Sequence, residues 1–215
     1  MTPRVSAEAV GTALLLAIVV GSGIMGEKLA AGNAGVALLA NSIATGAGLF
    51  TLISIFAPLS GAHFNPAVTI GAALDRALPL PTALAYIGAQ FVGAYAGVLA
   101  AHAMFGLPLV QVSVRARPTV GECLGEVIAT FGLLLTIRLL ARAPVAQVAA
   151  CVASWIVAAY WFTSSTSFAN PAVTAARSLT DTFAGIAPNH VASFVGSQLV
   201  GTGLALAVGR LFKSA

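Results

Sequence analysis

The chain has 215 residues, of which 59% are hydrophobic and only 7% are charged, whereas soluble domains carry roughly 25% charged residues. Its net charge of +4 comes from Lys and Arg residues that are scattered singly along the sequence, so no basic run indicates nucleic-acid binding. The composition excludes an ordinary soluble protein and predicts one whose partner is the lipid bilayer.

Apolar stretches long enough to cross a membrane recur along the chain, since crossing a hydrocarbon core of about 30 Å takes about 20 helical residues. They lie at 7–25, 36–57, 82–105, 120–141, 145–162 and 190–212. The first stretch contains Glu8 and has no small-residue cleavage site, so we expect a retained helix and not a signal peptide. The sequence thus predicts six membrane-spanning helices.

The two halves of the chain, about 1–110 and about 118–215, resemble each other. EAVGT from Glu8 matches EVIAT from Glu126, and GAQFVG (88–93) matches GSQLVG (196–201). Three spans per half is an odd number, so the second half must be inserted upside down. We therefore expect a single domain, 1–215, built as a 3+3 inverted repeat, which is the architecture of many channels and transporters. The glycines of the second motif pair are expected to allow close helix packing.

The motif NPAVT occurs after the second span of each half. Asparagine is a good N-cap, and proline suits the first helical position, where a backbone donor would be unpaired anyway. The stretches 66–75 and 171–180 are too short to cross, because ten residues make only about 15 Å of helix. We expect two half-helices that meet at the midplane. The two NPA boxes are Asn65, Pro66, Ala67, Asn170, Pro171 and Ala172.

Two helix starts that point at one spot have an electrical consequence. Each carries about half a positive charge, so the spot disfavours cations, including hydronium. The asparagine amides can donate hydrogen bonds there to a neutral molecule. The irregular segments 57–64 and 163–169 are tolerable at membrane depth only where they are buried in protein or line a wet cavity. The pattern favours passage of neutral solutes.

Taken together, the paired NPA boxes, the stretch SGAHFNPAVT, the Glu-x-x-x-Thr motifs and the 3+3 repeat resemble the aquaporin and aquaglyceroporin (major intrinsic protein) family. The resemblance covers essentially the whole chain. It implies an all-α membrane channel with six transmembrane helices and two re-entrant half-helices. It further implies a non-enzymatic homotetramer without cofactor or metal, with one pore per subunit.

The distribution of positive charge predicts the orientation in a bacterial inner membrane. Six Lys and Arg residues fall on the side of the termini and four on the opposite side, which favours cytoplasmic termini. The six are Arg4, Arg76, Arg138, Arg142, Arg210 and Lys213, and the four are Lys28, Arg115, Arg117 and Arg177.

Carboxylates within predicted spans are candidates for function. Glu8 and Glu126 could relay protons, which would make the protein a coupled transporter. The alternative, which the family resemblance favours, is that each accepts hydrogen bonds from backbone amides of a re-entrant loop. His63 either stabilises its loop or presents its carbonyl to solute.

The resemblance also implies an outer selectivity filter of four residues. Counting from the NPA asparagines places them at Thr45, Ala158, Ser167 and Val173. Water-selective relatives carry a bulky aromatic residue, a histidine and an arginine at the first, second and fourth positions, and this chain carries none of them. We expect a wider, less charged filter. Arg177, one turn beyond Val173, either reaches toward the pore mouth or is a solvated residue at its lip.

These filter residues and the surrounding run 160–185 resemble bacterial aquaglyceroporins associated with arsenic resistance, in which valine also replaces the filter arginine. The implied solutes are arsenite, methylated arsenicals, glycerol-like polyols and water. Two alternatives stay open: a water-selective aquaporin, and a proton-coupled secondary transporter with re-entrant segments.

Overall fold

The computed structural model describes residues 2–117 and 119–212, and the predicted terminal charge of Lys213 lies outside them. The described chain is helical throughout, apart from its connecting loops. Its long helices are α1 (Pro3–Leu29), α2 (Ala34–Ser60), α4 (Leu80–Met104), α5 (Val120–Leu139), α6 (Val145–Phe162) and α8 (Pro188–Leu211). All six are long and apolar enough to cross a membrane, which confirms the six predicted spans.

Two short helices interrupt this series at the NPA boxes. They are α3 (Pro66–Leu74) and α7 (Pro171–Ala176), and α7 continues into the single 3₁₀ turn η1 (Arg177–Leu179). Both begin at the proline, as expected from its fixed backbone angle. The α-helical part of the second is shorter than predicted, because the chain tightens into the 3₁₀ turn after Ala176.

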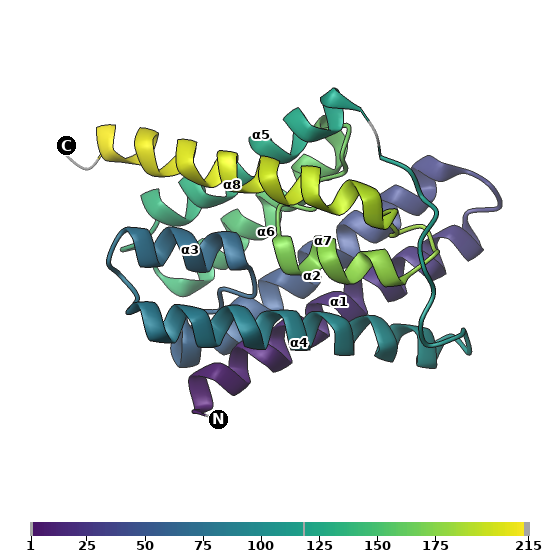
Figure 1. Cartoon of the computed structure of the whole chain (residues 1–215), viewed down its shortest axis with the longest axis horizontal. Coiled ribbons are helices and arrows are strands. Elements are labelled where there is room, and N and C mark those ends of the chain that lie inside the picture. The colour runs from purple at the N-terminus through teal and green to yellow at the C-terminus, as the bar shows by residue number, and fades with distance from the viewer. Residues whose placement is uncertain (1, 118, 213–215) are drawn as a thin grey trace.

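The helices pack as two groups joined side by side. Helix α1 packs against α2 and α4, α5 packs against α6 and α8, and α2 contacts α6 across the two groups. Figure 1 shows α3 and α7 between α4 and α8, while the start of α1 and the end of α8 lie at the same end of the molecule. We call this the inner end and the opposite one the outer end.

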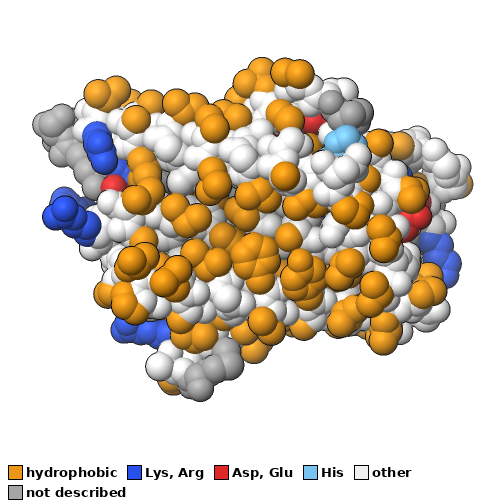
Figure 2. Space-filling view, in the orientation of Figure 1, with side chains coloured by type: hydrophobic (Ala, Val, Ile, Leu, Met, Phe, Trp, Pro, Cys, Tyr) orange, Lys and Arg blue, Asp and Glu red, His pale blue; other side chains and the backbone are white. Residues whose placement is uncertain are grey.

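The surface has the distribution of side chains that a membrane requires. Figure 2 shows apolar side chains over the middle of the visible face and charged side chains gathered at its two ends. Large exposed apolar residues include Val92 and Leu204. An apolar belt of this kind is stable against lipid but unfavourable in water.

Two of the four motif glycines allow close helix contact. A Cβ atom on Gly93 would lie 2.2 Å from the carbonyl oxygen of Ala9 in α1, and one on Gly201 would lie 2.4 Å from that of Val127 in α5. Within the subunit the expectation is wrong for Gly88 and Gly196, because no atom of another helix in the described chain lies within 4 Å of a Cβ placed there. Five positions correspond to about 140° around a helix, so each motif's first glycine faces elsewhere.

Candidate functional site

The asparagine of each NPA box is the N-cap of its half-helix. The side-chain oxygen of Asn65 accepts a hydrogen bond from the backbone N–H of Ala67 at 2.8 Å. That of Asn170 accepts bonds from Ala172 at 3.0 Å and Val173 at 3.2 Å. Each oxygen therefore serves its own helix start, which leaves the amide nitrogens free to point elsewhere.

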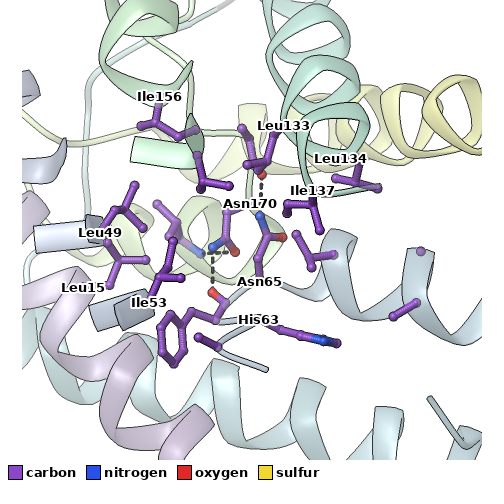
Figure 3. Close-up of a pocket in the computed structure, with 18 of the residues that line it drawn as sticks. Leu15, Leu49, Ile53, His63, Asn65, Leu133, Leu134, Ile137, Ile156 and Asn170 are labelled. Atoms are coloured by element: carbon purple, nitrogen blue, oxygen red, sulfur yellow. Dashed lines mark hydrogen bonds between the residues drawn. The ribbon is translucent and has the colours of Figure 1, made fainter. Parts of the chain in front are cut away.

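The amide nitrogens join the two boxes to each other. Asn65 Nδ2 donates to the carbonyl of Ala169 at 2.7 Å, and Asn170 Nδ2 donates to the carbonyl of Phe64 at 2.8 Å. Figure 3 shows the two asparagines side by side in the pocket. An amide group carries two N–H donors, so one donor on each asparagine remains for a solute.

The residue before each asparagine has an unusual backbone conformation. Phe64 has a φ angle of 49° and Ala169 one of 48°, in the left-handed region that L-residues rarely adopt. These conformations accompany the carbonyls' bonds to the opposite asparagine. Each costs of order 1 kcal/mol or more, so neighbouring contacts must hold it in place.

Glu8 supplies such contacts in the first half. Its fully buried carboxylate accepts hydrogen bonds from the backbone N–H groups of His63 (3.0 Å) and Phe64 (2.7 Å). It also accepts from the hydroxyl of Ser60 at 2.6 Å and the amide of Gln90 at 2.8 Å. These are the contacts that a loop-supporting carboxylate requires.

Glu126 has the corresponding environment in the second half. It is fully buried and accepts hydrogen bonds from the backbone N–H groups of Phe168 and Ala169, both at 2.8 Å. Gln198 Nε2 donates to it at 2.6 Å and to the hydroxyl of Thr174 in α7 at 2.8 Å. The carboxylate thus holds the strained loop residue, and the glutamine ties it to the half-helix.

Glutamines in this bridging role were not predicted from the sequence. Gln90 in α4 links Glu8 to Thr69 of α3, as Gln198 in α8 links Glu126 to α7. The signal was present, because both glutamines occupy the third position of the repeated motifs GAQFVG and GSQLVG. The flanking glycines indicate helix packing, but the glutamines between them form the hydrogen bonds to the buried carboxylates.

A cavity of about 280 Å³ passes the two asparagines and reaches toward both ends of the molecule. At its inner end lie Asp75 and Arg138, which form an ion pair. Figure 3 shows apolar side chains around the asparagines. The labelled ones are Leu15, Leu49, Ile53, Leu133, Leu134, Ile137 and Ile156. The wall is therefore mostly apolar, with polar groups concentrated along the re-entrant loops.

The outer end of the cavity is lined by three of the four predicted filter residues: Thr45, Ser167 and Val173. Thr45 Oγ1 lies 3.2 Å from the hydroxyl oxygen of Tyr160, within hydrogen-bonding distance. The buried hydroxyl of Ser167 has no hydrogen-bond partner among the described residues. Val173 presents an apolar side chain that is 5% exposed.

The placement of Ala158 in the filter is wrong. Ala158 is exposed on the outside of α6 and does not line the cavity, whereas Tyr160 and Ile156 from the same helix do. Two positions correspond to about 200° around a helix, so Ala158 and Tyr160 point in nearly opposite directions. Counting back from Asn170 could not fix the rotation of α6, because an irregular loop intervenes.

His63 lines the cavity between the asparagines and the inner end. Its ring nitrogen Nδ1 lies 3.1 Å from the hydroxyl of Thr69, and the ring packs edge-on against Tyr86. Its backbone N–H is one of the groups that Glu8 holds. The side chain is therefore within hydrogen-bonding distance of α3 while it lines the cavity.

Arg177 is buried, with 3% of its surface exposed, so it is not a solvated lip residue. It lines the outer end of the pore cavity and also a second cavity of about 500 Å³, which we call the outer vestibule. Arg117 lines the vestibule but is not among the residues that line the pore cavity. Burial lowers the pKa of both guanidinium groups, that of Arg177 to about 9, so Arg177 remains positively charged at pH 7.

Residues 2–147 match the family model described as "Major intrinsic protein". Over 210 residues the chain is 50% identical to the aquaglyceroporin AqpS of Rhizobium meliloti (strain 1021). The matched stretch covers 98% of this chain and 90% of that protein. The chain belongs to the major intrinsic protein family. As a family member it is a multi-pass membrane channel and not an enzyme.

Two further comparisons agree with the assignment of the chain to the major intrinsic protein family. It is 36% identical to the glycerol uptake facilitator protein of Streptococcus pneumoniae over 109 residues, or 44% of this chain and 47% of that one. The X-ray structure of the aquaglyceroporin from Plasmodium falciparum superimposes with a TM-score of 0.76 at 19% identity, covering 95% of this chain and 93% of the other. That superposition shows the aquaporin-like fold.

Proposed function

We propose that this channel passively conducts small neutral solutes that are larger than water, in both directions. The candidate solutes are arsenite, methylated arsenicals and glycerol-like polyols, with water passing as well. The observation that carries the proposal is the outer end of the cavity, where valine stands in place of a charged residue and hydroxyl groups line the wall.

The chemistry of this constriction suits a solute with both apolar and hydroxyl surfaces. The hydroxyls of Thr45 and Tyr160 lie on one side, and the unpartnered hydroxyl of Ser167 comes from the loop before α7. An unpaired buried hydroxyl is costly unless a solute or water satisfies it. Val173 adds an apolar surface that favours contact with a carbon or methyl group over contact with water.

The names of the relatives support the same class of solute. The 50% identical protein is described as an aquaglyceroporin, and a more distant relative as a glycerol uptake facilitator. Arsenous acid is a neutral trihydroxy molecule at pH 7, so its hydrogen bonding is similar to that of glycerol. A methylated arsenical is more apolar and fits the same mixed surface.

Stopped-flow measurements on proteoliposomes test the proposal. Parent vesicles should pass glycerol and arsenite well above protein-free vesicles. Val173→Arg should lower both by at least about tenfold while water still passes, because the added side chain narrows the filter and removes the apolar contact. Val173→Met is the matched control, since it adds similar length without charge, and we expect a smaller loss.

Two results would favour the alternatives. A parent that passes water but no glycerol or arsenite would be a water-selective aquaporin. Saturable uptake driven by a proton gradient would indicate a coupled transporter. If Val173→Arg left the ratio of glycerol to water permeability unchanged, Val173 would not be part of the filter.

The proposed assembly is a homotetramer with one pore per subunit, in the bacterial inner membrane with cytoplasmic termini. The exposed apolar faces of the long helices supply surface for lipid and for neighbouring subunits. The corresponding contacts of Glu8 and Glu126 support the 3+3 inverted repeat. Native mass spectrometry measures the subunit number, and protease protection of tagged termini in oriented vesicles measures the orientation.

A further inference from the structure

Arg177 is held firmly at the outer end of the pore. Its Nε donates to the carbonyl of Ala184, and its guanidinium carbon lies 3.4 Å from the centre of the Phe168 ring. Phe168 is itself buried and fixed, because its backbone N–H donates to Glu126. The guanidinium therefore occupies a defined place and is stabilised by the aromatic face.

The two terminal nitrogens of Arg177 remain available. Within residues 2–117 and 119–212, the hydrogen bond to Ala184 is the one that Arg177 donates to protein. The side chain lines both the pore cavity and the vestibule, which places Arg177 between the two cavities. A buried guanidinium with unpaired N–H groups at such a junction is suited to bind oxygen atoms of a solute.

Arg117 provides a contrast within the same structure. Its guanidinium carbon lies 4.7 Å from the centre of the same Phe168 ring. Its donors, however, go to the backbone carbonyls of Gly185 at 3.3 Å and Ser165 at 3.0 Å. Its contacts are thus those of a residue that fastens two loops together beside the pore.

The other charged side chains that line the vestibule already form an ion pair or hydrogen bonds with protein groups. Arg115 forms an ion pair with Glu27 at 2.8 Å. The carboxylate of Glu122 accepts hydrogen bonds from Thr119 in the capping box of α5. Arg177 is therefore the vestibule cation that combines free donors with a position on the pore itself.

We propose that Arg177 supplies the fixed positive charge of this pore, one helical turn outward from Val173, and that its free N–H groups bind oxygen atoms of neutral solutes entering the filter. The inference rests on the proposed conduction of neutral solutes and adds the residue that excludes cations. The 3₁₀ turn after Ala176 and the Phe168 ring together hold the guanidinium at the pore mouth.

The size of the effect follows from Coulomb's law. Two unit charges about 6 Å apart at an effective dielectric constant of about 20 repel strongly enough to lower passage of a cation about a hundredfold. A neutral solute of the same shape is not repelled. The charge should therefore appear as a ratio between matched neutral and charged solutes.

Urea and guanidinium form such a pair, because both are small and planar. Proteoliposomes of the parent, Arg177→Met, Arg177→Lys and Arg117→Met are compared for radiolabelled urea and guanidinium fluxes. We expect Arg177→Met to raise guanidinium flux and so lower the urea-to-guanidinium ratio at least about a hundredfold. Urea flux itself should fall, because methionine has no N–H groups to bind the urea oxygen. Arg177→Lys should keep the ratio within about tenfold, and Arg117→Met within about threefold.

A double variant guards against a merely structural effect. Val173→Arg combined with Arg177→Met should regain cation exclusion at the position that other family members use. If Arg177→Met does not reconstitute, Arg177→Gln takes its place, because its amide can still donate to Ala184. An unchanged ratio in the neutral variant, or an equal loss in Arg117→Met, would overturn the proposal.

Failure of this inference and failure of the proposed function would give different results in these flux measurements. A parent that passes neither urea nor glycerol contradicts the proposed function. Guanidinium entry is measured against protein-free vesicles, so it still decides the role of Arg177. Parental guanidinium entry equal to that of Arg177→Met would show that no charge barrier resides there.

Discussion

Replacing Glu126 by glutamine separates a channel whose buried carboxylate supports a loop from a transporter whose carboxylate carries protons. The substitution keeps the size of the side chain and removes its charge. Three N–H groups, from Phe168, Ala169 and Gln198, point at the carboxylate at 2.6–2.8 Å. Glutamine offers them one oxygen and an NH₂ group that is itself a donor.

The magnitude follows from that mismatch. At least one buried N–H loses its acceptor and faces a donor instead. Hydrogen bonds to charged groups contribute about 1.5–3 kcal/mol each, and a buried group left unpaired costs about 1–3 kcal/mol. We expect Glu126→Gln to destabilise the fold by about 2–5 kcal/mol, which corresponds to a fall in melting temperature of roughly 5–15 °C.

Thermal unfolding in detergent measures the stability, and glycerol flux in proteoliposomes with and without a pH gradient measures the transport. Glu122→Gln is the matched control. Glu122 lies one turn earlier on α5, is only half-buried, and belongs to a capping box in which glutamine also serves. The control should unfold within about 2 °C of the parent and leave flux unchanged.

One pattern of results would refute the reasoning. If Glu126→Gln unfolded at the parental temperature but abolished glycerol uptake, and if parental uptake followed the pH gradient, Glu126 would act as a proton carrier. A destabilised variant whose residual flux ignores the gradient is the result that loop support predicts.

Three further predictions concern the filter, the inner mouth and helix packing. Tyr160→Ala should raise the permeability to a four-carbon polyol relative to glycerol at least about threefold in stopped-flow assays, whereas Tyr160→Phe should change it less, because the ring remains. The single variant Asp75→Ala should lower the melting temperature more than the double variant that also carries Arg138→Met. Only the single change leaves the nearly buried guanidinium of Arg138 without its ion-pair partner. Equal losses in the two variants would contradict this. Gly93→Ala should destabilise by about 1–3 kcal/mol by pushing α4 from α1, while Gly88→Ala should be neutral or stabilising by up to about 1 kcal/mol in thermal unfolding.

Much of the architecture could be predicted because it depends on local chemistry. Hydropathy alone gave six spans, since each must satisfy the same membrane thickness. The half-helices start at Pro66 and Pro171 because capping by Asn65 and Asn170 is decided within a few residues. The approach of the two boxes was also predictable, because equivalent positions in oppositely inserted halves meet near the middle.

The facing of individual side chains was less predictable. Thr45, Ser167 and Val173 line the cavity as counted, but Ala158 points outward and Tyr160 takes its place. Thr45 is separated from Asn65 by the end of α2 and the short loop 61–64, and the other two residues lie beside Asn170. Ala158 is separated from Asn170 by a helix end and an irregular loop, so its direction depends on how α6 is rotated.

The sequence by itself determined a six-span membrane channel with two capped half-helices, because burial of apolar surface and helix capping act on neighbouring residues. Only the tertiary structure decided what surrounds each polar group. Gln90 and Gln198 became bridges because separate helices brought them to the buried carboxylates. Arg177 faces the pore mouth because Phe168 and the Ala184 carbonyl hold it there. Such contacts join residues whose side-chain directions depend on helix rotation and loop path.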